Sequence, residues 1–219
     1  SIPQIIGKKK VDLFKFFKQV EMPFKWLPQL KEYAENKGLI FIVSPFDEGA
    51  ADELEKNNVK VYKIASPELN HLPFLSHIAK KQKPMIISSG LSTISDIEEA
   101  INTIYKENNR KIALLHCVSS YPAPSKEYNL KVMETLKNAF QIPVGVSDHS
   151  LNPVLIPKLA TACGASVIEK HFTLDKKLPG ADHPYALNPK ELELMVREIR
   201  KTEKWNQKKR SEFLNSDPL

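Results

Sequence analysis

Short apolar runs rich in β-branched residues recur along the chain, and a new run begins about every twenty to thirty residues. Runs of this length and composition predict buried strands. The six expected strands are Leu39 to Val43, Val59 to Ala65, Pro84 to Ser88, Ile112 to Cys117, Val144 to Ser147 and Ser166 to Phe172.

The stretches between these runs have the period of a helix. One carries an apolar stripe of Ile94, Ile97, Ile101 and Ile104 and is expected to begin at a cap, Ser92 or Thr93. Two further helices are expected to begin at Asn152-Pro153 and Asn188-Pro189. An asparagine side chain caps the first turn, and a proline at the first helical position has no N–H that lacks a partner.

Strands and helices therefore alternate, which predicts an α/β fold with parallel strands joined by right-handed helical crossovers. The chain has only seven glycines, and no expected strand is followed by a glycine-rich phosphate-binding turn. An open dinucleotide-binding sheet thus has little support. Polar residues instead follow strand after strand, as at the active face of a (β/α)8 barrel. We expect a (β/α)8 TIM-type barrel of which the chain holds about six βα units.

The domain organisation follows from this count. A full barrel needs eight strands and about 250 residues, whereas the chain has 219. Residues 1–22 contain no convincing pair of buried strands, so either the first strands of the barrel are absent or Ile2 to Ile6 forms one. No stretch of the sequence has the composition of a linker between domains. We therefore expect a partial barrel domain over residues 1–205 and a polar tail over residues 206–219.

Composition narrows the class of protein. The chain is 42% hydrophobic and 26% charged, which excludes a disordered protein. It contains no apolar run of the roughly 18 to 20 residues that cross a membrane and no secretory signal, so a cytoplasmic protein is expected. Cys117 and Cys163 lie in apolar sequence, which favours buried, reduced thiols.

The net charge of +6 raises the question of a nucleic-acid partner. No basic stretch is interleaved with stacking aromatic residues, and no nucleic-acid-binding module can be recognised. These observations argue against nucleic acid. A site for a small anionic substrate would use the same positive charge.

Two histidines follow neighbouring expected strands, each with a carboxylate close by: His149 beside Asp148, and His171 beside Glu169. The ends of adjacent strands converge, so the two imidazoles are expected to meet at the mouth of the barrel. Such a pair suits a divalent transition metal with open coordination positions. Taken alone the signal is weak, because a histidine at a loop edge often only bonds to backbone. His116, inside an apolar run, is expected to be a core residue.

Serines end four of the expected strands: Ser66, Ser88, Ser119 and Ser147. Their short hydroxyls, with Lys63 as a nearby charge, suit phosphate or carboxylate oxygens. A single serine more often serves a turn or a cap. The repetition at strand after strand is what indicates an anionic substrate. Neither a Gly-x-Ser-x-Gly elbow nor a His-Glu-x-x-His pair is present, which argues against serine hydrolase and zincin chemistry.

In five ordered segments the chain resembles the sialic acid synthases, that is, N-acetylneuraminate synthase and its legionaminate, pseudaminate and spore-coat polysaccharide relatives. The segments are SPFD (44–47), KIAS (63–66), ISSG followed by LS (87–92), LLHCVSSYPAPSKEYNL (114–130), and the pair VSDHSL (146–151) with IEKHFTLDKKLPGADH (168–183). The match runs without a break from about Phe24 to Arg200, and its last two motifs together are highly specific.

The resemblance implies a condensation of phosphoenolpyruvate with an N-acetylated aminohexose such as N-acetylmannosamine. The products would be a nine-carbon 2-keto sugar acid and inorganic phosphate. It also implies Mn²⁺, or another divalent ion such as Mg²⁺ or Co²⁺, held by His149 and His171. In that family the ion polarises the open-chain aldehyde while the phosphoenolpyruvate methylene attacks it, and water adds to the resulting oxocarbenium centre.

The same resemblance implies roles for the other strand-end residues. Glu169 would move protons or orient water near the reacting carbons, and Tyr121 and Asp182 would face the amino sugar. The residues that would hold the phosphate and carboxylate of phosphoenolpyruvate are Lys63, Ser66, Ser88 and Ser147, with Ser119 where many family members have asparagine.

Two parts of the family pattern are not matched. One is the pair of first strands, with an acidic residue near the sugar and a lysine that holds phosphate. The other is a C-terminal antifreeze-like domain that reaches over the partner's site in the homodimer and supplies an arginine. Weak or no turnover is therefore expected from these residues alone. The alternatives are a module that binds phosphoenolpyruvate and metal without catalysis, and another metal-dependent barrel such as an aldolase or hydrolase.

Overall fold

The computed structural model describes residues 3–6, 9–12, 14–15, 18 and 21–206. A sheet of five parallel strands lies at its centre, in the order β3-β4-β5-β6-β7, which is also their order along the chain. The strands are β3 Tyr62–Ile64, β4 Met85–Ser88, β5 Ile112–Cys117, β6 Val144–Asp148 and β7 Ile168–Lys170. Five of the six apolar runs are thus confirmed as strands.

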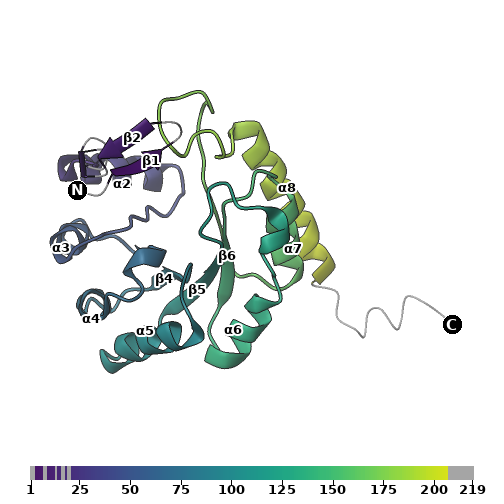
Figure 1. Cartoon of the computed structure of the whole chain (residues 1–219). Helices are drawn as coiled ribbons and strands as arrows, with labels where there is room; N and C mark the ends of the chain where they lie inside the picture. The colour runs from purple at the N-terminus through teal and green to yellow at the C-terminus, as the bar shows by residue number, and fades with distance from the viewer. Residues whose placement is uncertain (1–2, 7–8, 13, 16–17, 19–20, 207–219) are drawn as a thin grey trace.

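Helices connect the strands and lie around the outside of the curled sheet (Figure 1). The arrangement confirms the prediction of an α/β barrel with fewer than eight strands. The α-helices are α2 Leu27–Asn36, α3 Glu48–Lys56, α4 Leu72–Ala79, α5 Ile94–Lys106, α6 Val132–Phe140, α7 Leu155–Ala162 and α8 Pro189–Asn206, and short 3-10 helices cover η1 Phe24–Trp26, η2 Ser66–Glu68 and η3 Ser125–Glu127.

Local sequence signals set where helices begin. Thr93 caps α5, and its side chain and that of Asp96 bond reciprocally to each other's backbone N–H. Asn188 and Glu191 form the same box at the start of α8. Asn152 also accepts two backbone N–H groups, but α7 begins only at Leu155. The helix expected at Asn152-Pro153 therefore starts later, because the asparagine closes a turn before it.

The core lies between the sheet and the helices. On α5 the predicted stripe is largely correct, since Ile97, Ile101 and Ile104 are buried while Ile94 is exposed. Tyr62 and Phe74 are among the fully buried side chains. Burial on this scale holds the strands in fixed register, so their carboxyl ends present side chains at defined positions.

Two expectations are wrong. Residues 39–43 pair with the sheet only through the bridge from Val43 to Tyr62, and the Leu39 and Ile40 side chains are exposed. This run lies along the edge of the five-stranded sheet, so it is not covered on both faces. Cys117 is buried as expected, but Cys163 is exposed at the C-terminal end of α7, where its neighbours no longer enclose it.

At the start of the chain, β1 Pro3–Ile6 pairs antiparallel with β2 Lys9–Asp12. These strands form a separate two-stranded sheet, so the run from Ile2 to Ile6 supplies a strand but not one of the parallel strands. The predicted polar tail covers residues 206–219. Its first residue, Asn206, is the last residue of α8, and residues 207–219 lie outside the described residues. In the described part of the chain no helix has both the length and the apolar character to span a membrane.

Candidate active site

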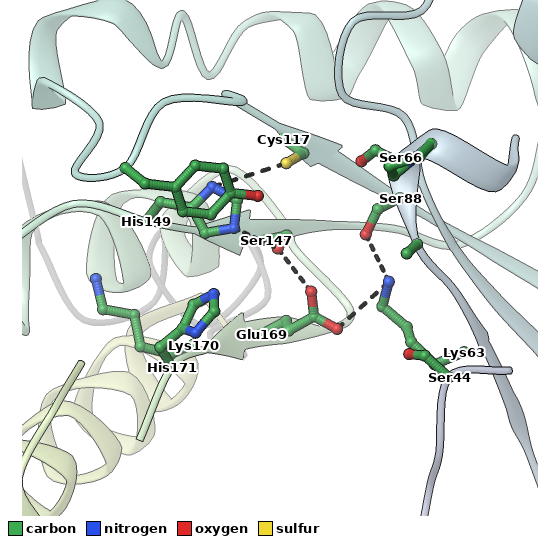
Figure 2. Close-up of a pocket in the computed structure, with 13 residues that line it drawn as sticks. Ser44, Lys63, Ser66, Ser88, Cys117, Ser147, His149, Glu169, Lys170 and His171 are labelled. Carbon is green, nitrogen blue, oxygen red and sulfur yellow. Dashed lines mark hydrogen bonds and ion pairs between the residues drawn. The ribbon is translucent and has the colours of Figure 1, made fainter. Parts of the chain in front are cut away.

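A cavity of about 290 Å³ opens at the carboxyl ends of the parallel strands. Strand β3 contributes Lys63 to the lining of this cavity, β6 contributes Ser147, and β7 contributes Glu169. Figure 2 shows Glu169 between Lys63 on one side and the pair His149 and His171 on the other. The lining residues are Ser44, Lys63, Ala65, Ser66, Pro67, Ser88, Cys117, Tyr121, Ser147, His149, Glu169, Lys170 and His171.

Lys63 brings a buried positive charge to one side of the cavity. Its residue is 8% exposed, and its Nζ donates to Ser88 Oγ at 2.8 Å and to the Ile64 carbonyl at 2.9 Å. Burial lowers the pKa of Lys63, and the Glu169 carboxylate, 3.5 Å away, opposes that shift. An ammonium has three donors, so one remains for Glu169 or for an incoming anion.

Gly90 allows several polar groups to gather beside this charge. Its N–H donates to Ser66 Oγ at 3.0 Å, and a Cβ at this position would lie 2.2 Å from Ser119 Oγ and 2.9 Å from Ser66 Oγ. Any other residue would push these hydroxyls apart. Cys117 lies next to them, and burial raises the pKa of its thiol, with the Ser66 and Ser119 hydroxyls opposing the shift. This region therefore offers neutral donors.

Glu169 connects the two sides of the cavity. One carboxylate oxygen accepts from Ser147 Oγ at 2.6 Å, and the other faces Lys63. The same Ser147 hydroxyl lies 3.4 Å from His149 Nε2. Glu169 is thus held by groups on both sides, and its carboxylate lies where a substrate bridging the cavity would pass.

His149 is 4% exposed and has a defined ring orientation. Its Nδ1 lies 2.9 Å from the Val118 carbonyl, which assigns the proton to Nδ1 and leaves the lone pair on Nε2 facing the cavity. Burial lowers the pKa of His149, so the ring is neutral at pH 7. The Tyr121 ring lies over the imidazole, with 4.2 Å between ring centroids.

His171 lies beside His149, with 5.4 Å between the ring centroids. Its Nδ1 is 3.8 Å from an oxygen of Asp182, whose other oxygen accepts a hydrogen bond from the Tyr185 hydroxyl. Asp182 is exposed at the rim of the cavity, while Tyr185 is buried and places its ring 5.1 Å from that of His171. The Asp182 carboxylate thus faces Nδ1 of His171.

The two imidazoles fit a divalent metal with an open coordination sphere. No cluster of three or more His, Cys, Asp or Glu side chains able to hold an ion occurs among residues 21–206 or the shorter described segments. A pair of imidazoles supplies two nitrogen ligands and leaves the other positions to water or substrate. In His149, the hydrogen bond from Nδ1 to a carbonyl is the usual outer contact of a metal-binding histidine.

The structure brings the predicted residues to one place. Ser119 lies beside the cavity and Asp182 at its rim, and the rest line it: Lys63, Ser66, Ser88, Tyr121, Ser147, His149, Glu169 and His171. Their chemical roles stay predictions. The residues that sequence reasoning missed include Ser44, Cys117 and Lys170. Ser44 directly follows an apolar run, which is a signal that could have identified it.

His116 lies behind the cavity, and it gives a prediction about stability. It is half-buried in β5, with Nε2 2.7 Å from the Tyr128 carbonyl, and burial lowers its pKa. The unfolded chain binds a proton at this residue near pH 6.5, whereas the folded chain does so only at lower pH. The free energy of unfolding is therefore expected to fall as the pH drops below about 6.5 and to show no such loss above it.

Urea unfolding at pH 7.5 and pH 5.5 measures this loss. The His116→Gln variant keeps an amide donor near the Tyr128 carbonyl but does not titrate, so its stability should fall less between the two pH values. An equal fall in both proteins would contradict the assignment to His116.

Comparisons with known proteins identify the family. The family model of the NeuB family matches residues 4–211. The spore coat polysaccharide biosynthesis protein SpsE of Bacillus subtilis is 48% identical over 196 residues, which are 89% of this chain and 52% of SpsE. An N,N'-diacetyllegionaminic acid synthase of Campylobacter jejuni is 42% identical over 188 residues, covering 85% of this chain and 56% of that protein.

Solved structures show the same likeness. The crystal structure of Bacillus subtilis SpsE aligns with a TM-score of 0.84 at 47% identity and covers 90% of this chain and 55% of that one. An N-acetylneuraminic acid synthetase from Leptospira borgpetersenii aligns with a TM-score of 0.84 at 35% identity, covering 92% of this chain and 68% of that one. The chain spans about half the length of the curated relatives it matches. It belongs to the NeuB family.

Proposed function

We propose that this cavity binds phosphoenolpyruvate and an open-chain N-acetylated aminohexose and joins them into a nine-carbon 2-keto sugar acid, with release of inorganic phosphate. One observation carries the proposal: a buried lysine with serine hydroxyls and a pair of imidazoles face the same cavity, with a carboxylate between them. The names of the relatives, a legionaminic acid synthase and a spore coat polysaccharide protein among them, support the class of product.

The lysine side of the cavity would hold phosphoenolpyruvate. The Lys63 ammonium and the hydroxyls of Ser66, Ser88 and Ser147 supply charge-assisted and neutral hydrogen bonds to phosphate and carboxylate oxygens. Ser119 adds a donor next to Gly90. Because strands and mutual hydrogen bonds fix these groups, they would hold phosphoenolpyruvate in one orientation beside the histidines.

The histidine side would receive the sugar aldehyde. His149 and His171 would hold Mn²⁺ or a similar divalent ion, which when bound supplies Lewis-acid polarisation of the aldehyde. Tyr121 and Asp182 lie at the outer edge of this side and would contact the hydroxyl and N-acetyl groups of the sugar. The resemblance to the NeuB family supports an N-acetylated aminosugar as the acceptor, and polar rim groups suit such a molecule.

The proposed reaction joins two carbon atoms and releases phosphate. The methylene carbon of phosphoenolpyruvate bonds to the aldehyde carbon, whose oxygen takes up a proton and becomes a hydroxyl. Water adds to the central carbon of the former enol, and phosphate leaves with the bridging oxygen, so that the 2-keto group forms. Glu169, held by Ser147 and facing Lys63, would orient that water and accept its proton.

We further propose that residues 1–205 are part of the barrel domain of such a synthase and that they carry its phosphoenolpyruvate and metal sites. The phosphate-binding lysine of the second strand and the arginine of the family's homodimer lie outside the matched motifs. Metal binding by His149 and His171 does not involve those groups, so it is the property to test first.

The test is Mn²⁺ binding followed by EPR, with and without phosphoenolpyruvate. The wild-type chain should bind Mn²⁺, and phosphoenolpyruvate should change the spectrum of the bound ion. His149→Ala and His171→Ala should each weaken binding at least about 100-fold, because loss of a ligand costs more than loss of an outer contact, which costs about 10- to 100-fold. His71→Ala is the matched control, since His71 is an exposed histidine at the start of α4. Mn²⁺ binding that survives both cavity variants would overturn the metal assignment.

Turnover separates the proposal from its alternatives. Phosphate release should require Mn²⁺, phosphoenolpyruvate and an N-acetylated aminosugar together. Retained ligand binding without turnover, even with a family C-terminal domain added, would indicate a binding module. Indifference to phosphoenolpyruvate would indicate another metal-dependent barrel such as an aldolase.

A further inference from the structure

A buried ion pair adjoins the two candidate metal ligands in the chain, and one of its members, Lys170, also lines the cavity. Asp148 ends β6 and Lys170 ends β7, and the two residues are partners in the register of these strands. Their Oδ2 and Nζ atoms are 2.7 Å apart, and the two side chains are 0% and 3% exposed. The pair therefore ties together the two strand ends from which His149 and His171 follow.

The same pair also fixes the backbone on the far side of His149. Asp148 Oδ1 accepts from the Ser150 N–H at 2.8 Å, and Lys170 Nζ donates to the Ser150 carbonyl. Both polar backbone groups of Ser150 are thus bound by this one ion pair. Residue 149 lies between Asp148 and Ser150, so its position follows from theirs.

Tyr128 completes the support of His149. Its hydroxyl, on a fully buried side chain, accepts from the His149 N–H at 2.6 Å, and the His149 carbonyl accepts from the Ala123 N–H at 3.0 Å. The ring itself donates to the Val118 carbonyl. The backbone and the ring of His149 are therefore fixed by hydrogen bonds to three other residues, Tyr128, Ala123 and Val118.

We propose that Asp148, Lys170 and Tyr128 are positioning residues that set the orientation of the His149 ring and its spacing from His171. The metal-binding consequence rests on the proposed function. A buried ion pair is often no more stabilising than apolar side chains of the same size, so stability alone gives little reason for one here. The hydrogen bonds to Ser150 give a reason, because apolar side chains cannot make them.

The first measurement is Mn²⁺ affinity in variants that keep the fold. Asp148→Leu combined with Lys170→Met replaces both charges with apolar side chains, and Tyr128→Phe removes one hydroxyl. Native circular dichroism with Mn²⁺ affinity about 10- to 100-fold weaker is expected for the double variant, the usual effect of losing an outer contact of a metal-binding histidine. A smaller loss in the same direction is expected for Tyr128→Phe.

The matched control is Lys158→Met combined with Glu198→Leu. It removes an ion pair of 3.0 Å between α7 and α8, away from the cavity, and should leave Mn²⁺ affinity unchanged. Unchanged affinity in Tyr128→Phe and in a folded double variant would overturn the proposal.

A second measurement needs no metal. Long-range ¹H–¹⁵N NMR of the metal-free chain reports the tautomer of His149, expected to be the Nδ1–H form in the wild type. Both variants should show a mixture of tautomers, because the ring is no longer held against the Val118 carbonyl. If the wild type does not bind Mn²⁺, the metal assignment of the proposed function fails, but the tautomer still decides the positioning role. A wild-type tautomer in both variants would overturn it.

Discussion

Replacing Lys170 alone with methionine is expected to lower the free energy of unfolding by about 3–5 kcal/mol, the usual cost of breaking a buried ion pair from one side. The substitution leaves the Asp148 carboxylate in a place with 0% side-chain exposure and no cation. It also leaves the Ser150 carbonyl without its donor. Urea unfolding at pH 7, followed by circular dichroism, measures the loss.

A partly exposed ion pair provides the comparison. Lys176 lies 2.8 Å from Glu191 with about a third of its side chain exposed, so Lys176→Met should cost at most about 1 kcal/mol. Adding Asp148→Leu to Lys170→Met should recover most of the stability, because no unpaired charge then stays buried. A loss in Lys170→Met no larger than in Lys176→Met would show that water reaches Asp148.

The strands could be predicted because parallel strands are buried on both faces and so read as unbroken apolar runs. The runs around Lys63, Ser88, Cys117, Ser147 and Glu169 all became strands of the central sheet. Residues 39–43 have the same composition but lie at the sheet edge. The composition of a segment indicates that it prefers an extended backbone. It does not indicate whether other elements will pack on both faces of that segment.

The candidate site was predictable for a related reason. Polar residues at the carboxyl ends of parallel strands must converge, so the order of runs and polar positions along the chain is enough to group Lys63, Ser147, Glu169 and His171. The partner of Lys170 could not be predicted in the same way. Lys170 lies between Glu169 and His171 in the sequence, and the sequence does not say which neighbouring strand its side chain contacts. Only the register of β6 with β7 shows that it meets Asp148.

The side-chain contacts at the rim of the cavity also could not be predicted from the sequence. The resemblance placed Tyr121 and Asp182 near the sugar. The ring contact of Tyr121 with His149 and the hydrogen bond from Tyr185 to Asp182 depend instead on how the segments around residues 121 and 182 fold. The rings of Tyr121 and Tyr185 also meet, with 5.8 Å between their centroids, although they belong to segments far apart in the chain. Local periodicity carries no information about such contacts.

Replacing Lys63 with methionine is expected to weaken phosphoenolpyruvate binding by about 30- to 4,000-fold, the equivalent of the roughly 2–5 kcal/mol lost when one member of a buried charged pair is truncated. Lys63 is the ammonium that the cavity presents beside Ser88, and its loss also leaves Glu169 without its cation. A bare carboxylate would then repel the incoming anion. Titration calorimetry with phosphoenolpyruvate measures the change.

Two further variants make the result specific. Lys60→Met changes a lysine three residues earlier that is 66% exposed, so it should leave binding within about twofold of the wild type. Glu169→Gln removes the negative charge while keeping an acceptor for Ser147, so phosphoenolpyruvate should bind at least as tightly although the proposed water-activating group is lost. Equal affinities in Lys63→Met and Lys60→Met would place the anion elsewhere. Tight binding in Glu169→Gln with lost turnover would instead assign Lys63 to binding the anion and Glu169 to the chemical step.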